Sequence, residues 1–147
     1  MTQVEKMILL KVKHPFIISM DYVFVLDTRV YFVMEYIEGG DLSVHLRKRS
    51  VFWETEVKFF AAQIILALNF LHSKGIIYQD LKPANVLLET NGYIKLTDFG
   101  AAKYSYQTQK YKTFIGTLDF IAPEVLKRQP YSKSVDWWSL GILIYQL

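Results

Sequence analysis

The spacing of apolar residues along the chain predicts a mixture of amphipathic helices and β-strands. The most regular pattern runs from Glu54 to Ser73, and Gly75 follows it where a helix commonly places a C-terminal glycine. Shorter helices are expected over residues 2–12, before His14-Pro15, and after Asp41, a suitable N-cap. The apolar stripe of the long helix consists of Val57, Ala61, Ile64, Leu68 and Leu71.

A last helix is expected to begin near Ser132 or Ser134 and to run to the end of the chain. Its residues are apolar almost all around, which indicates burial on every side and assigns Trp137-Trp138 to the core. Residues 101–117 are instead polar and without periodicity, and an irregular segment of that length is commonly a functional loop.

β-Branched and aromatic runs bounded by turn residues predict two antiparallel strand pairs. The first pair turns at Asp27-Thr28, and the second turns at Asn91-Gly92, a dipeptide typical of tight hairpins. If Asn91 and Gly92 form the whole loop, the register places Asn85 opposite Asp98, whereas a loop one residue longer would shift it. The four strands are expected over residues 16–26, 29–36, 86–90 and 93–97.

Composition narrows the class of protein. A chain of 147 residues that is 52% hydrophobic and 16% aromatic has enough material for one domain with a core. The net charge of +3 is small and the basic residues are scattered, so nothing favours nucleic acid or a membrane surface as a partner. The absence of cysteine excludes disulfides, and neither a signal peptide nor a membrane span is visible. We therefore expect an intracellular location, cytoplasmic with the nucleus as the alternative.

Candidate chemistry is concentrated in two loops that flank the predicted hairpin. Asp80, Lys82 and Asn85 precede it, and Asp98 follows it in Asp98-Phe99-Gly100. An amide oxygen and a carboxylate side by side suit a hard divalent cation, while the adjacent carboxylate and ammonium suit an anionic substrate. The three histidines share no metal-ligand spacing and are interpreted as structural or surface residues, namely His14, His45 and His72.

These loops belong to a series of motifs that together resemble the eukaryotic serine/threonine protein kinases, most of all the AGC group with the cyclic-nucleotide-dependent kinases. The resemblance runs essentially end to end. In chain order its anchors are Glu5 within Glu5-Lys6-Met7-Ile8-Leu9, Met34-Glu35-Tyr36, Tyr78 to Asn85, Asp98-Phe99-Gly100, Ala122-Pro123-Glu124 and Asp136-Trp137-Trp138.

The resemblance implies an α+β, protein kinase-like fold that is present in part. Residues 1–36 would be the end of the N-lobe, with the glutamate helix and two strands. Residues 37–147 would be the hinge and the C-lobe core, as far as the first large helix after the activation segment. The Gly-rich loop and the strand lysine of the family would lie before Met1, and further helices after Leu147.

The resemblance also assigns roles in phosphoryl transfer. Asp80 would orient the hydroxyl of the substrate, Lys82 would place a cation near the transferring phosphoryl group, and Thr117 would bond both and mark serine/threonine specificity. Asn85 and Asp98 would be the Mg²⁺ ligands. Each could instead be an ordinary loop residue, but the spacing of the motif favours the functional interpretation.

The remaining predicted site residues concern ATP. The main chains of Glu35 and Ile37 would bond the adenine, and Leu87 and Glu5 would complete the nucleotide site. Asp41 would contact the ribose and a basic residue upstream of the acceptor in a protein substrate, a role compatible with its being an N-cap.

Thr113 aligns with the phosphothreonine of the activation loop, which implies an upstream activating kinase; a surface threonine that is never phosphorylated is the alternative. Gln79 replaces the arginine that usually binds this phosphate, and Lys103 is the only basic member of the pocket that the sequence identifies. A phosphate on Thr113 is therefore expected to order the loop only weakly. Asp136 is either a first-turn helix acid or a buried carboxylate that holds the catalytic loop, and we favour the second.

Two functions remain open. The chain is either the catalytic segment of an ATP- and Mg²⁺-dependent kinase acting on protein serine and threonine, or a non-catalytic, pseudokinase-like scaffold. Asp80, Lys82, Asn85 and Asp98 favour the kinase, but without the nucleotide-gripping strands we expect little turnover from these 147 residues alone. A Mg²⁺-dependent hydrolase is disfavoured because nothing in the sequence positions a water.

Overall fold

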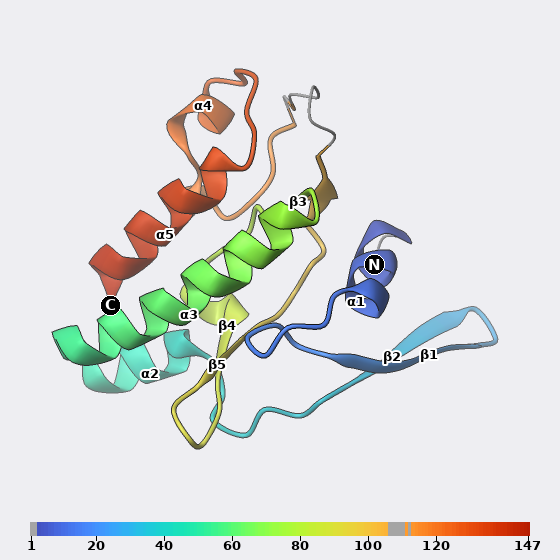
Figure 1. Cartoon of the computed structure of the whole chain (residues 1–147), viewed down its shortest axis with the longest axis horizontal. Helices are drawn as coiled ribbons and strands as arrows, with labels where there is room; N and C mark the ends of the chain where they lie inside the picture. The colour runs from blue at the N-terminus through green and yellow to red at the C-terminus, as the bar shows by residue number, and fades with distance from the viewer. Residues whose placement is uncertain (1–2, 106–110, 112) are drawn as a thin grey trace.

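A computed structural model describes the chain except for residues 1–2, 106–110 and 112, and the side chains of residues 3 and 4 (Figure 1). It combines helices with three two-stranded antiparallel sheets, β1-β2, β3-β6 and β4-β5, as the predicted α+β class requires. In chain order the elements are α1 (Gln3–Lys11), β1 (Met20–Leu26), β2 (Arg29–Met34), α2 (Leu42–Arg49), α3 (Glu54–Ser73), β3 (Ile76–Ile77), the 3₁₀ turn η1 (Pro83–Asn85), β4 (Val86–Leu88), β5 (Ile94–Leu96), β6 (Lys103–Tyr104), the 3₁₀ turn η2 (Leu118–Phe120), α4 (Pro123–Leu126) and α5 (Ser134–Gln146).

Helix α3 runs through the middle of the molecule and contacts α5, β3 and β5 (Figure 1). It occupies the predicted residues, and Gly75 follows it with a φ of +70°, a conformation that favours glycine. Gln63 adds a polar contact to this apolar face, because its Oε1 accepts a hydrogen bond of 2.9 Å from the main chain of Ile94. The helix thereby carries one strand of the β4-β5 hairpin. Its buried residues are Phe60, Gln63, Ile64, Ala67, Leu68 and Leu71.

Strands β1 and β2 form the predicted pair, with Leu26 opposite Arg29 and Asp27-Thr28 as the turn. The first strand starts at Met20, four residues later than expected, because Ile17 instead forms a parallel bridge to Leu96 of β5. The hairpin projects away from the helices (Figure 1), and much of its apolar surface is exposed.

The predicted register of the β4-β5 hairpin is wrong by one residue. The structure pairs Val86 with Leu96, and the main-chain amide of Thr97 donates to Asn85 O at 3.0 Å. The loop includes Thr90 as well as Asn91-Gly92, because the amide of Glu89 bonds Tyr93 O at 2.8 Å. Gly92 has a φ of +89°, as in three-residue hairpin loops that end with glycine in the left-handed region. Asn85 therefore pairs with Thr97 and not with Asp98.

Helix α5 begins at Ser134, as predicted, but it is not buried on every side. Leu140 and Leu143 are buried, whereas Trp138 is 47% exposed and Tyr145 93% exposed. Trp137 is half-buried against the core and makes an edge contact with the ring of His72. Only one member of the tryptophan pair is thus core, because the described residues cover one face of α5 alone.

Two glycines offer a matched test of the packing that brings α2 toward the hairpin. A Cβ on Gly39 would lie 2.0 Å from the main-chain oxygen of Leu88, whereas a Cβ on Gly141 in α5 would meet nothing within 4 Å. We expect Gly39→Ala to lower the free energy of unfolding by about 2–3 kcal/mol, since backbone must move. Gly141→Ala should raise it by about 1 kcal/mol, because alanine is the better helix former. Urea unfolding of both variants measures this, and equal effects would contradict the close approach at Gly39.

Candidate active site

A buried carboxylate at the start of α5 holds the loop that carries the candidate chemistry. Asp136 is fully buried and accepts hydrogen bonds from the main-chain amides of Tyr78 at 2.9 Å and Gln79 at 2.8 Å. His72, at the end of α3, lies 2.7 Å from the same carboxylate. The predicted buried role of Asp136 agrees with this geometry. Asp136 thus joins α3, α5 and the loop after β3 at one point.

The side chain of Asp80 is the centre of a hydrogen-bond network. Thr117 Oγ1 donates to its Oδ1 at 2.8 Å, and Lys82 Nζ donates to its Oδ2 at 2.8 Å. Lys82 Nζ also donates to Thr117 Oγ1 at 2.8 Å, so the ammonium bridges the carboxylate and the hydroxyl. The three residues predicted to be catalytic are therefore in direct contact, although they come from two loops more than thirty positions apart.

Asn85 supports Asp80 from the other side. Its Nδ2 donates to the main-chain oxygen of Asp80 at 2.8 Å and to Oδ2 at 3.0 Å. Its amide oxygen is thus the only side-chain atom of Asn85 that could coordinate a cation. Since Asn85 is not the strand partner of Asp98, the assignment of these two as metal ligands rests on the resemblance and not on the hairpin register.

Asp98 lies at the same cavity as Asp80, Lys82 and Thr117. This cavity, of about 370 Å³, is lined by residues from both loops. Among the residues that the structure describes, no group of three or more His, Cys, Asp or Glu side chains could hold a metal ion without other ligands. A site of one carboxylate and one amide fits Mg²⁺ when the phosphates of a nucleotide supply further oxygens. The lining residues are Asp80, Lys82, Asp98, Gly100, Ala101, Ile115, Gly116 and Thr117.

Two residues beside these groups adopt a backbone conformation that favours glycine. Gln79 has a φ of +70° and Asp98 a φ of +57°. Such conformations cost roughly 1–2 kcal/mol for an ordinary residue and persist where surrounding contacts enforce them. At Gln79 the enforcing contact is the hydrogen bond that its main-chain amide donates to Asp136 Oδ1. At Asp98 it is the hydrogen bond of 3.1 Å from the amide of Gly100 to Asp98 Oδ1.

Four side chains behind the site are buried in one cluster. Leu9, Met20, Tyr78 and Phe99 all belong to the main core, and the rings of Tyr78 and Phe99 meet edge to face at 5.3 Å. The hydroxyl of Tyr78 donates to the main-chain oxygen of Thr97. Burial, together with the nearby carboxylates, raises the pKa of Tyr78 well above 10.0, so this hydroxyl keeps its proton.

The hinge residue Glu35 is fixed by contacts that the sequence did not reveal. Its carboxylate accepts from the amide of Ser19 at 2.6 Å and pairs with Lys95 Nζ at 3.2 Å. Burial acts to raise the pKa of Glu35, but these partners hold it below its usual value. The amide of Glu35 donates to Ser19 O at 3.3 Å. Glu35 and Ile37 line a separate cavity of about 380 Å³ together with residues 89–91.

The other predicted nucleotide residues lie in two places. Asp41 caps α2, since its Oδ1 accepts from the amide of Val44 at 3.0 Å, and its main chain bridges Leu87 of β4. Burial acts to raise the pKa of Asp41, but hydrogen bonds from Ser43 and Val44 hold it lower. Glu5 reaches the Asp98-Phe99-Gly100 turn, where its Oε2 lies 3.7 Å from the place that a Cβ on Gly100 would occupy.

The candidate phosphosite Thr113 is exposed, and its main-chain oxygen accepts a hydrogen bond of 3.0 Å from Tyr131 Oη. Lys103, the basic residue expected nearby, lies over the ring of Tyr111, with Nζ at 5.3 Å from the ring centre. Partial burial lowers the pKa of Lys103. Residues 106–110 and 112 of the same predicted loop lie outside the described part of the chain.

Three contributors to the site were not predicted. The sequence indicates only a structural or surface role for His72, and it singles out neither Lys95 nor Tyr131. Each has at least one partner more than fifty residues away in the sequence, namely Asp136 for His72, Glu35 for Lys95 and Gln79 for Tyr131. A lone histidine or tyrosine beside an apolar run gives no local signal for such a partner.

This combination of a helical core, a catalytic-type loop and a facing Asp-Phe-Gly turn defines the class of protein. A family model described as "Protein kinase domain" matches residues 1–147. The chain therefore belongs to the protein kinase domain family, and the resemblance stated above is confirmed.

Curated relatives agree with this family. Over 146 residues the chain is 53% identical to cAMP-dependent protein kinase type 3 of Saccharomyces cerevisiae. The aligned residues make up 99% of this chain and 36% of the yeast protein. Ribosomal protein S6 kinase alpha-3 of Homo sapiens is 46% identical over 147 residues, which cover 99% of this chain and 20% of the relative. Serine/threonine-protein kinase Sgk1 of Xenopus tropicalis is 46% identical over 145 residues, covering 97% and 35%. The chain thus spans between about a fifth and a third of the length of these relatives.

The junction at Asp136 yields a prediction about stability. Asp136→Ala would leave two main-chain amides and the ring of His72 without their buried acceptor. We expect the free energy of unfolding to fall by about 3 kcal/mol. Asp119→Ala, which removes an exposed carboxylate, is the control and should change it by less than about 0.5 kcal/mol. Chemical denaturation compares the two, and a small loss for Asp136→Ala would mean that the junction is not essential.

Proposed function

We propose that the chain is the catalytic segment of a serine/threonine protein kinase that transfers the γ-phosphoryl group of ATP to protein hydroxyls. The observation that carries this proposal is the bridge by Lys82 Nζ between the carboxylate of Asp80 and the hydroxyl of Thr117. That bridge puts a hydrogen-bond acceptor and a cation at one cavity, which are the two groups that phosphoryl transfer to a hydroxyl needs.

Each group has a defined task in this reaction. The carboxylate of Asp80 already accepts from Thr117, Lys82 and Asn85, which fixes its orientation toward the hydroxyl of a substrate. The ammonium of Lys82 offsets negative charge on the phosphoryl group as it moves. Thr117 holds the two side chains at a fixed distance and lies next to the place where the acceptor would bind.

Protein kinases use ATP and Mg²⁺, and the donor set of this chain fits that pair. Asp98 would supply a carboxylate oxygen and Asn85 an amide oxygen to Mg²⁺, while Glu35, Ile37, Asp41, Leu87 and Glu5 would hold the nucleotide. When bound, the cation neutralises phosphate charge. The chain's own contribution is to orient Asp98 through the amide of Gly100 and Asn85 through Asp80.

The proposed kinase function also assigns the lobes, the partners and the location of the chain. Residues 1–36 form the end of the N-lobe and residues 37–147 the hinge and C-lobe core. The partners are protein substrates with serine or threonine acceptors, with Asp41 placed to favour a basic residue upstream, and an upstream kinase that modifies Thr113. Among the described residues, no helix is long and apolar enough to cross a membrane. We propose an intracellular location.

A non-catalytic scaffold is the second candidate. Failure of the chain to bind Mg²⁺ and ATP would favour it. Because positioning of ATP supplies much of the catalysis in phosphoryl transfer, residues 1–147 alone would then show little or no turnover.

A chimaera distinguishes the two functions. Residues 1–147 replace the matching segment of the yeast cAMP-dependent kinase, and transfer of labelled phosphate from ATP to a serine peptide is measured. We expect transfer, and we expect Asp80→Asn to lower its rate by about 10²- to 10⁴-fold, since the acceptor of the hydroxyl proton is lost.

The control for the chimaera is Glu54→Gln, which removes an exposed carboxylate on α3 and should leave the rate unchanged. Binding of Mg²⁺ and ATP is measured in parallel. A chimaera that binds ATP without transferring phosphate, or an Asp80→Asn variant as active as the parent, would favour the scaffold.

Gln79 leads to a prediction about regulation. In the same chimaera, phosphorylated at Thr113, Thr113→Ala should reduce activity only slightly, because an amide cannot form a charge-assisted pair with phosphate. In the Gln79→Arg background Thr113→Ala should cost about tenfold or more. Mass spectrometry verifies the phosphate and steady-state rates give the comparison. Equal and complete loss in both backgrounds would refute the idea.

A further inference from the structure

Tyr131 lies between the catalytic loop and the segment before Thr117, and it binds that segment twice. Its main chain forms an antiparallel bridge with Tyr111, with N to O distances of 3.0 and 3.2 Å. Its hydroxyl donates to the main-chain oxygen of Thr113 at 3.0 Å. Tyr131 itself is buried, with 2% of the residue exposed.

The hydroxyl of Tyr131 also contacts Gln79. Which group donates in each of these two hydrogen bonds follows from the chemistry of the Gln79 amide, the Tyr131 hydroxyl and the Thr113 carbonyl. The carbonyl of Thr113 can only accept, so the single proton of Tyr131 Oη must go to it. The hydroxyl oxygen must then accept from Gln79 Nε2, at 2.7 Å. Burial raises the pKa of Tyr131, which keeps that proton in place at neutral pH.

This arrangement leaves the side-chain oxygen of Gln79 without a hydrogen bond among the described residues. That oxygen, Oε1, is buried. Such an orphaned acceptor is unfavourable, and native structures contain few. The amide therefore faces Tyr131 at the expense of its own oxygen, which indicates that the bond to Tyr131 decides its orientation.

Gly116, three residues after Thr113, approaches the main chain of Gln79 directly. A Cβ on Gly116 would lie 2.8 Å from the main-chain oxygen of Gln79, and Gly116 has a φ of +108°. The next residue, Thr117, bonds Asp80. Residues 113–117 are thus held at one end by Tyr131 and at the other by the catalytic loop.

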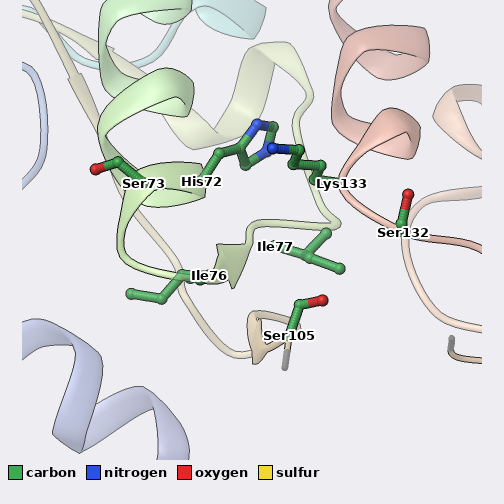
Figure 2. A pocket seen from close by; sticks show the side chains of 8 residues that line it. His72, Ser73, Ile76, Ile77, Ser105, Ser132 and Lys133 are labelled. Carbon is green, nitrogen blue, oxygen red and sulfur yellow. The ribbon is translucent and has the colours of Figure 1, made fainter. Parts of the chain in front are cut away.

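Tyr131 also packs in a small apolar cluster that includes Ile77 and Val135. Figure 2 shows that Ile77, Ser105 and Ser132 come from three segments around a common cavity. The cavity measures about 480 Å³.

We propose that Tyr131 is a positioning residue: with Gln79 it holds residues 113–117, and through them Thr117, against Asp80 without a phosphate on Thr113. For its effect on catalysis this proposal rests on the proposed kinase function. The tether itself does not, because it consists of contacts within the described chain. Its acceptor is the main chain of Thr113, so Thr113→Ala leaves it intact.

Amide hydrogen exchange on the full 147-residue chain tests the tether. The variants are Tyr131→Phe, which removes only the hydroxyl, and Gln79→Met, which removes the donor together with the orphaned acceptor. We expect each to speed exchange at residues 114–117 about three- to tenfold, with α3 amides unchanged. The double variant should exceed the larger single effect only slightly, since both changes break one chain of bonds.

The matched control is Tyr93→Phe, whose hydroxyl has no hydrogen-bond partner among the described residues; it should alter no exchange rate at residues 114–117. If Tyr131→Phe unfolds the chain, Gln79→Met gives the same comparison. The proposal is overturned if residues 114–117 are unprotected in the parent chain, if neither variant changes their exchange, or if the two effects add.

An activity arm separates the tether from the kinase function. In the active chimaera, Tyr131→Phe should lower kcat more than it raises the KM for peptide, with or without Thr113→Ala. Faster exchange at residues 114–117 in a chimaera without phosphoryl transfer would refute the kinase function and leave the tether standing. Unchanged kcat despite faster exchange would refute the positioning role.

Discussion

The buried carboxylate of Asp136 is the contact on which the site depends. It satisfies two consecutive main-chain amides, at Tyr78 and Gln79, and the ring of His72, so one side chain orders the end of α3 and the beginning of the catalytic loop. Without a buried acceptor those amides would be unpaired, and the left-handed conformation of Gln79 would lose its support. The chemistry at Asp80 therefore begins with a structural bond one residue earlier.

Beyond Asp136, the site side chains are positioned by polar contacts and not by the apolar core. Lys82 and Thr117 each donate a hydrogen bond to one carboxylate oxygen of Asp80, and Asn85 donates a further one to Oδ2. Each member is partly or fully removed from solvent, which strengthens the bonds between them. The apolar cluster around Phe99 supplies the platform, while these few hydrogen bonds set the direction of the side chains.

Local patterns predicted the helices well and the long-range contacts poorly. The period of α3, the cap at Asp41 and the turn at Asp27-Thr28 depend on neighbours in sequence, and all three agree with the structure. The predicted register of the second hairpin was wrong because the loop also includes Thr90, and a glycine in the left-handed region occurs in three-residue loops as well. The residues predicted to be catalytic were found through family motifs, whereas Tyr131 gave no signal because its partners lie in other segments.

The hydrogen bond from Tyr131 to Thr113 ends on a main-chain oxygen, and this affects how the sequence can vary. Every amino acid offers that oxygen, so the contact places no demand on the side chain at position 113. Residues there can be exchanged, or modified, while the segment keeps its anchor. The hydrogen bond that anchors the loop and the identity of the side chain at position 113 can thereby change independently of each other.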